Sequence, residues 1–232
     1  MFFFDPTYLL FMAPAFLLMA LTSWYVKSAY NKWSRVPSRS RLSGAQAAQR
    51  LITAGGLSGV QVQGIRGEMT DNYDPRDKVL RLSEGVGNGA SVASLAIAAH
   101  ELGHAMQDAE AYFPLRFRAA LVPSVQIGSN LGWILIFIGM FLHWTNLAWL
   151  GVIVFSAGAV FSLATLPVEF NASARAKRLL VETGIVQGED EQRGVNNVLN
   201  AAALTYVAGA VSALLQLLYF VVLIGGGGRR RS

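Results

Sequence analysis

The chain has 232 residues, of which 53% are hydrophobic and 14% are charged, whereas a soluble domain carries about 25% charged residues. This composition predicts a membrane protein. The chain contains no cysteine, which excludes disulfides, thiolate metal ligands and thiol nucleophiles. Its net charge of +5 does not predict nucleic-acid binding, because the basic residues flank apolar segments and no nucleic-acid-binding motif accompanies them.

The first apolar segment, residues 8–26, is close to the length of about 20 residues that spans a bilayer. It lacks the basic start and the small-residue cleavage site of a signal peptide, so we expect residues 1–26 to be a retained transmembrane anchor. By the positive-inside rule, basic residues after the anchor predict that the following chain is cytoplasmic and that the protein lies in the plasma membrane. These residues, with no acidic residue among them, are Lys27, Lys32, Arg35, Arg39, Arg41 and Arg50.

Residues 27–121 are expected to form a small water-facing α+β domain. A short helix over 43–52 precedes Gly55 and Gly56, which stop it. Residues 60–63 alternate with period two, and residues 78–82 partly do so after a turn that contains Pro75. The domain should therefore contain two strands before its next helix.

That helix carries the pattern H-E-x-x-H, at Ala98-Ala99-His100-Glu101-Leu102-Gly103-His104-Ala105-Met106-Gln107. Residues four apart on a helix lie about one turn apart, roughly 5 to 6 Å between Cβ atoms, so His100 and His104 can bind one metal ion. Glu101 lies beside that ion, where a carboxylate can take a proton from metal-bound water. Imidazoles in an apolar helix are costly without a metal. The pattern therefore predicts one zinc ion per chain, with a chance match as the alternative.

The second strand of this domain is a candidate for substrate binding. A strand beside the metal helix can hold an extended peptide by backbone pairing, which makes Val79, Leu80, Arg81 and Leu82 the candidate substrate edge. An ordinary covering hairpin is the alternative.

Two further apolar runs, residues 125–142 and 147–166, predict a transmembrane hairpin over 122–166. Residues 167–200 should return to the cytoplasmic side as a second active-site helix region. The last apolar run, 203–224, predicts a C-terminal transmembrane helix with a basic tail, 201–232. Four full crossings would place Arg229, Arg230 and Arg231 outside, which conflicts with the positive-inside rule. We take the orientation from the first loop, because the first helix usually sets it.

Catalytic zinc usually takes three protein ligands. The longer pattern H-E-x-x-H-x-x-G-x-x-H is absent, because Gln107 and Glu110 stand at its glycine and last histidine positions. We therefore expect a carboxylate as the third ligand. Glu169 is the first choice, since it follows Pro167 in a helix that leaves the membrane on the side of the H-E-x-x-H domain. A first-turn charge that faces the helix dipole is its alternative role, and Glu110 is the second choice of ligand.

Several of these segments resemble the bacterial membrane-bound neutral zinc metallopeptidases called YugP-like, over nearly the whole chain. The segments are Asp71-Asn72-Tyr73-Asp74-Pro75 with Val79-Leu80-Arg81-Leu82-Ser83, then the H-E-x-x-H helix, then Val168-Glu169-Phe170-Asn171-Ala172-Ser173. The last also resembles the E-x-x-A-D motif of prenyl-protein-type membrane peptidases, with Ser173 in place of its Asp. That resemblance implies that Glu169 is a zinc ligand. Arg175 matches a family arginine, which implies an anchor for substrate or oxyanion, and a cytoplasmic flanking charge is the alternative.

Together these observations predict a mainly α membrane protein, with about four transmembrane helices and a cytoplasmic α+β zincin-like domain. The expected function is zinc-dependent hydrolysis of peptide bonds in membrane or membrane-proximal proteins, with Glu101 as general base. A non-catalytic membrane assembly protein with a structural zinc site is the competing class. A metal transporter is disfavoured, because the runs 125–142, 147–166 and 203–224 contain no ionisable side chain of the Asp, Glu, Lys, Arg or His type.

Overall fold

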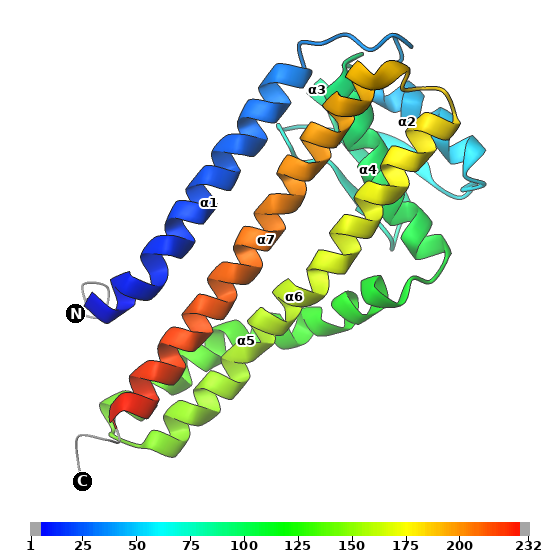
Figure 1. The fold of residues 1–232 in the computed structure, drawn as a ribbon. Coiled ribbons are helices and arrows are strands. Elements are labelled where there is room, and N and C mark those ends of the chain that lie inside the picture. The colour runs from blue at the N-terminus through cyan, green and yellow to red at the C-terminus, as the bar shows by residue number, and fades with distance from the viewer. Residues whose placement is uncertain (1–5, 228–232) are drawn as a thin grey trace. The chain divides into compact units, whose positions relative to one another are not determined.

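The structure is a computed structural model that describes residues 6–227, and it is mainly helical (Figure 1). In chain order its elements are α1 (Pro6–Trp33), α2 (Gly44–Ala54), β1 (Gln61–Ile65), β2 (Asn72–Asp74), β3 (Val79–Ser83), α3 (Glu84–Gly87), α4 (Val92–Ala109), α5 (Phe113–Phe141), α6 (Thr145–Glu182) and α7 (Gly188–Gly227).

The chain divides into two compact units. The first, here called the apolar unit, comprises the described parts of residues 1–21, 116–166 and 206–232. The second, here called the polar unit, comprises residues 22–115 and 167–205. Each unit is described by itself.

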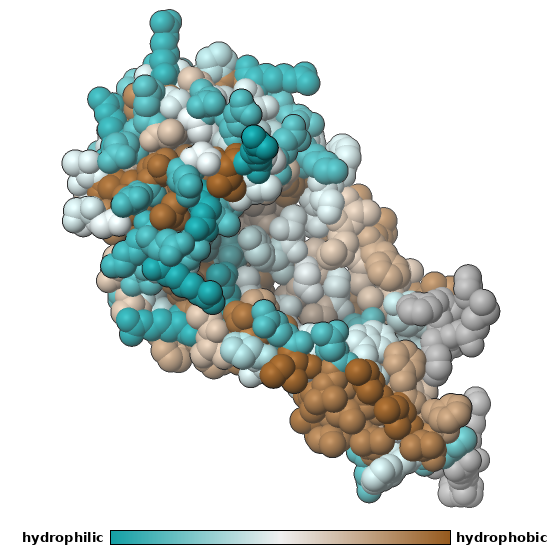
Figure 2. All heavy atoms as spheres, turned by 180° about the vertical axis from the view of Figure 1, so that it is seen from behind, coloured by the Kyte–Doolittle hydropathy of each residue, from teal (hydrophilic) through white to brown (hydrophobic). Residues whose placement is uncertain are grey.

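Four helices, α1, α5, α6 and α7, are long and apolar enough to cross a membrane. In the apolar unit, α5 and α6 approach closely, since a Cβ atom on Gly132 would lie 2.8 Å from the backbone nitrogen of Phe155. Large apolar side chains of α5, such as Phe137 and Phe141, are exposed. Figure 2 shows apolar side chains gathered over the hairpin of α5 and α6, whereas polar side chains cover much of the part that contains the sheet. Exposed apolar surface of this extent favours contact with lipid.

The polar unit contains a three-stranded mixed sheet in the order β1-β3-β2. β3 is parallel to β1 and antiparallel to β2. The turn between β2 and β3 is closed by Asp74, whose Oδ1 accepts a hydrogen bond of 2.9 Å from the backbone N–H of Arg76. Leu80 and Leu82 of β3 are buried against Ala48 of α2 and Ala98 of α4. Successive side chains of a strand point to opposite faces, so the burial of Leu80 and Leu82 fixes which face of the sheet packs on the helices.

Helix α4 is the centre of the polar unit. Its N-cap is Ser91, whose side chain accepts from the N–H of Ser94 and satisfies one of the free donors at the helix start. Its apolar side chains, including Leu95 and Leu102, join a core with Leu180 of α6 and Leu199 of α7. Burial of one such leucine contributes about 1.5 to 3 kcal/mol. Because α4 is covered on several sides, polar groups along it lie in a largely dry environment.

Most elements occur where the sequence predicts them, and the differences concern two short elements and the bounds of the long helices. β2 and α3 have no predicted counterpart, and both are short. α5 begins at Phe113 and α7 at Gly188, so both helices extend well beyond the apolar runs that start at residues 125 and 203. The basic tail with Arg229, Arg230 and Arg231 lies outside the described residues.

Candidate metal centre

Helix α4 carries His100, Glu101 and His104 within a single turn. The two imidazole rings lie on the same side of the helix, with their centroids 4.9 Å apart and their planes nearly perpendicular. Both rings are largely buried, with 12% and 13% of their side-chain surface exposed. The helix therefore presents two imidazoles to one small volume, as the spacing predicts.

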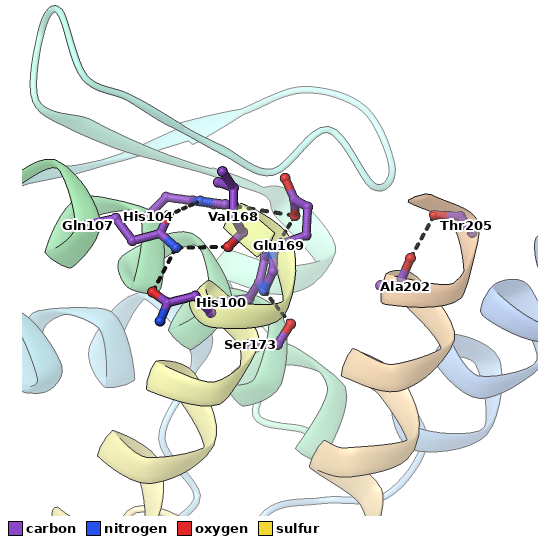
Figure 3. Close-up of polar contacts among 9 residues, drawn as sticks. His100, His104, Gln107, Val168, Glu169, Ser173, Ala202 and Thr205 are labelled. Carbon is purple, nitrogen blue, oxygen red and sulfur yellow. Dashed lines mark hydrogen bonds and ion pairs between the residues drawn. The ribbon is translucent and has the colours of Figure 1, made fainter. Parts of the chain in front are cut away.

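Helix α6 brings the carboxylate of Glu169 to both imidazoles (Figure 3). Its Oε2 lies 3.3 Å from Nε2 of His100 and 3.6 Å from Nε2 of His104. Only 3% of the surface of Glu169 is exposed. A buried carboxylate needs compensation by positive charge or by a metal, and both imidazoles lie close enough to supply it when protonated.

The approach of α6 depends on a residue without a side chain. A Cβ atom on Gly103 would lie 2.5 Å from the carbonyl oxygen of Ala172 and 3.0 Å from its Cα. The two helices are therefore in backbone contact one residue before His104 and three residues after Glu169. Any larger residue at position 103 would have to push α6, and with it Glu169, away from the histidines.

The geometry of the three residues fits zinc. One nitrogen from each histidine and one oxygen of Glu169 all lie within 4.8 Å of one another. In a tetrahedral site with metal–ligand bonds of about 2.1 Å, neighbouring ligand atoms lie about 3.4 Å apart, close to the 3.3 and 3.6 Å found here. Two imidazoles and one carboxylate are also a donor set of catalytic zinc sites that keep one coordination position open.

The charges of the site shift the pKa values of its members in different directions. Burial raises the pKa of Glu169, but hydrogen bonds and charge interactions with His100 and His104 outweigh it, and the pKa lies below its usual value. Burial lowers the pKa of His104, but the interactions with Glu169, Glu101 and Gln107 together raise it by more. Burial raises the pKa of Glu101, and this effect outweighs the charges of His100 and His104, which lower it. The site therefore holds an ionised ligand carboxylate and a second carboxylate of higher basicity.

Two polar side chains contact the outer nitrogens of the imidazoles (Figure 3). Oε1 of Gln107 lies 3.0 Å from Nδ1 of His104, and Oγ of Ser173 lies 3.1 Å from Nδ1 of His100. Such contacts orient metal-binding imidazoles. Sequence reasoning assigned neither contact, although Gln107 follows His104 at the helical spacing of three residues. Ser173 stands where the prenyl-protease-type motif has an aspartate, and its hydroxyl reaches the histidine in place of a carboxylate.

Glu110 and Arg175 lie together but outside the group of three ligand atoms. Arg175 forms two short contacts with Glu110, Nη1 to Oε1 at 2.6 Å and Nη2 to Oε2 at 2.7 Å. The structure thus pairs Glu110 with an arginine rather than bringing it to the histidines.

The expectation that β3 offers a free edge to substrate is wrong. β3 is the middle strand, and its backbone pairs with β1 on one side and β2 on the other. The side chains of Leu80 and Leu82 are buried, and Arg81 is paired with Asp74 and Asp77. The free edges of the sheet belong to β1 and to the three-residue strand β2, whose existence the sequence did not reveal.

Comparison with known proteins agrees with this geometry. A family model described as "Putative neutral zinc metallopeptidase" matches residues 8–225. The chain is 44% identical over 216 residues to the "Putative membrane protease YugP" of Bacillus subtilis (strain 168), which covers 92% of this chain and 96% of that protein. No solved structure matches.

The contact at Gly103 yields a first prediction. The substitution Gly103→Ala should lower zinc affinity by about 10-fold or more and destabilise the fold by about 1 to 3 kcal/mol, because the added methyl separates α4 from α6. Chelator competition and thermal unfolding of the detergent-purified protein would measure both effects. Gly209→Ala is the matched control, since a Cβ at this helical position meets no atom within 4 Å. Equal zinc affinity in the two variants would contradict the role given to Gly103.

A second prediction concerns pH. The pKa of His104 is raised above 6.5, so below that raised value the metal-free site holds a proton that zinc must displace. The ion pair of protonated His104 with Glu169 stabilises the metal-free protein at low pH, and this stabilisation is lost as pH rises through the raised pKa. Zinc affinity should therefore increase between about pH 6 and about pH 8, by up to about 10-fold per pH unit for each proton released.

Chelator competition across this pH range would test the prediction. Glu169→Gln removes the carboxylate that raises the pKa of His104, so the pH dependence in this variant should move to lower pH. A zinc affinity that is constant over this range would contradict the prediction.

Proposed function

This chain belongs to the family described as putative neutral zinc metallopeptidases, and on that premise we propose that it is a membrane-embedded zinc endopeptidase that hydrolyses peptide bonds in membrane or membrane-proximal proteins. One observation carries the proposal. Two imidazoles one turn apart on α4 and a buried carboxylate from α6 present their ligand atoms within 4.8 Å of one another, next to the additional carboxylate of Glu101.

In this proposal His100, His104 and Glu169 hold one zinc ion per chain. When bound, zinc activates a water molecule for attack and polarises the scissile carbonyl. The protein keeps both imidazoles correctly oriented, because Nε2 of each faces Glu169 while Nδ1 of each has its own polar contact with Gln107 or Ser173. The low pKa of Glu169 keeps this ligand ionised at neutral pH.

Glu101 acts as the general base. Its carboxylate accepts a proton from the attacking water and delivers it to the nitrogen of the leaving amine. The raised pKa of Glu101 supports this role, because a base is most effective when its pKa lies near the working pH. A group with this function contributes about 10² to 10⁴-fold in rate.

The architecture we propose is a zincin-like polar unit on the cytoplasmic side of the plasma membrane. The order of the H-E-x-x-H helix and a later helix with the third ligand supports the zincin-like assignment. The six basic residues between Lys27 and Arg50, without an acidic residue among them, support the cytoplasmic side.

The substrate class follows from the place of Glu169 in the chain. Glu169 comes three residues after Leu166, the last residue of an apolar run of spanning length. A ligand so near the end of a membrane segment favours substrates that are themselves held at the membrane.

The catalytic role of Glu101 can be separated from a structural zinc site. Purified wild-type protein should contain one zinc ion, which His100→Ala should lose and Glu101→Gln should keep. Cleavage of an unstructured protein should disappear in both variants, with a loss of at least about 10²-fold for Glu101→Gln. Metal analysis, thermal unfolding and a gel-based cleavage assay would measure these outcomes. Cleavage by Glu101→Gln at the wild-type rate would instead indicate a non-catalytic protein with a structural zinc.

The substrate class can be tested with one cleavable sequence in two forms. In liposomes that contain the protein, the sequence tethered to a transmembrane anchor should be cleaved at least about 10-fold faster than its soluble form at equal total concentration, because the tether raises its effective concentration at the site. Glu101→Gln in the same liposomes controls for other proteases. Equal rates for the two forms would contradict a membrane-held substrate.

A further inference from the structure

A continuous series of hydrogen bonds leads from Arg175 to His104. Nε of Arg175 donates to Oδ1 of Asn171 at 2.7 Å, and Nε2 of Gln107 donates to the same oxygen at 3.0 Å. Gln107 also donates from Nε2 to the carbonyl oxygen of Val168 at 2.8 Å. Its Oε1 then lies 3.0 Å from Nδ1 of His104. Figure 3 shows the last part of this series, from Gln107 to His104.

The chemistry of the Arg175 guanidinium and of the Val168 carbonyl fixes the direction of every hydrogen bond in this series. A guanidinium can only donate hydrogen bonds, and a backbone carbonyl can only accept them. Arg175 therefore requires the oxygen of the Asn171 amide on its side, and both this oxygen and the carbonyl of Val168 require the NH₂ group of Gln107. The oxygen of Gln107 must then face His104 as an acceptor. Nδ1 of His104 is therefore the donor, which leaves Nε2, on the side of Glu169, as the nitrogen that can bind a metal.

Burial makes these directions costly to reverse. Gln107 is 0% exposed, and 13% of the side-chain surface of Arg175 is exposed. A buried donor or acceptor left without a partner costs about 1 to 3 kcal/mol. The guanidinium is itself held in place by its two contacts with Glu110 and by the ring of Tyr112, 5.8 Å from its Cζ atom. Rotation of either amide by half a turn would set two donors or two acceptors against each other.

We propose that Arg175 is a positioning residue of the metal centre, which acts through Asn171 and Gln107 to keep Nδ1 of His104 protonated and Nε2 available as the metal ligand. This inference rests on the zinc site of the proposed function, and it replaces the expectation that Arg175 anchors substrate or oxyanion. His100 lacks such control, because the hydroxyl of Ser173 can either donate or accept. The two imidazoles thus differ in how firmly their protonated nitrogen is selected.

The first test is the zinc affinity of the detergent-purified full chain, measured by chelator competition. Gln107→Leu removes the direct partner of His104 and should weaken zinc binding by about 10 to 100-fold. Arg175→Gln, one step further out, should weaken it by a smaller factor of about 3 to 10-fold. Arg175→Lys should bind zinc as weakly as Arg175→Gln does, because lysine keeps the charge but lacks the Nε–H group that contacts Asn171.

Arg178→Gln is the matched charge control. It removes the same charge from the same helix, but Arg178 is exposed and its ion pair is with Glu182, at 3.9 Å. This variant should bind zinc as the wild type does. A loss as large as that of Arg175→Gln would show that only the net charge of α6 matters and would overturn the proposal.

A rescue experiment tests the direction of the hydrogen bonds. A carboxylate at position 171 has only acceptor oxygens and needs no arginine to orient it. In an Asn171→Asp background, the substitution Arg175→Gln should therefore cause no further loss of zinc affinity. An equal loss in both backgrounds would contradict action through Asn171, since independent effects add.

The proton on His104 can also be observed directly. The chain has only three histidines, so nitrogen NMR of the zinc-loaded protein with isotope-labelled histidine resolves the ring nitrogens of each. The Nδ1 proton of His104 should exchange slowly in the wild type and faster in Arg175→Gln, whereas that of His100 should not change. Unchanged exchange at His104 would overturn the proposal.

Different results would contradict the zinc site and the positioning role of Arg175. If wild type and His100→Ala bind zinc equally, the site itself is wrong and the proposed function fails with it. If His100→Ala loses zinc but Arg175→Gln binds it as the wild type does, only the positioning role is wrong.

Discussion

The candidate metal centre depends on the backbone contact between Gly103 of α4 and Ala172 of α6. Because Gly103 has no side chain, α6 can approach α4 closely enough for the carboxylate of Glu169 to lie 3.3 Å from one imidazole and 3.6 Å from the other. A carboxylate side chain spans only a few bonds, so a small separation of the helices would take its oxygen out of reach. The position of a glycine thus sets the geometry of the three ligands.

The same close approach excludes solvent from the site, and this exclusion gives the polar groups their properties. In a dry environment a carboxylate such as Glu169 must be compensated, and the imidazoles supply that compensation in the metal-free protein. Burial also raises the basicity of Glu101, and the charges of His100 and His104 do not offset this effect. Two carboxylates close to the same pair of histidines thereby acquire opposite characters, one suited to hold a metal and one suited to move a proton.

The polar groups next to the site run outward from Gln107, which is buried, to Asn171 and Arg175, which are partly buried. Each of these groups makes its hydrogen bonds with the protein, and their donors and acceptors can be matched in one arrangement only. This series of hydrogen bonds begins at the salt bridge of Arg175 with Glu110, near the surface, and ends at Nδ1 of His104. A surface charge pair stabilises a protein little by itself, and our proposal gives this pair a function through the groups that connect it to the candidate metal centre.

The sequence by itself determined what depends on local spacing. The spacing of four positions from His100 to His104 places both rings on one face of a helix, and runs of apolar residues fix the approximate positions of the membrane helices. The choice of Glu169 as third ligand came from its place after Pro167 on the side of the H-E-x-x-H domain and from a resemblance, and the structure brings its oxygen to the histidines.

The tertiary structure decided what depends on packing between distant segments. Only the fold shows that β2 covers β3 and leaves it no free edge, that Glu110 meets Arg175, and that Ser173 and Gln107 contact the outer nitrogens of the imidazoles. Helical and strand periodicities report which face of an element is apolar, but they do not report which neighbour covers that face. The partners of Arg175 lie up to 65 positions away along the chain, and they are set by how closely two helices pack, which no local pattern of residues encodes.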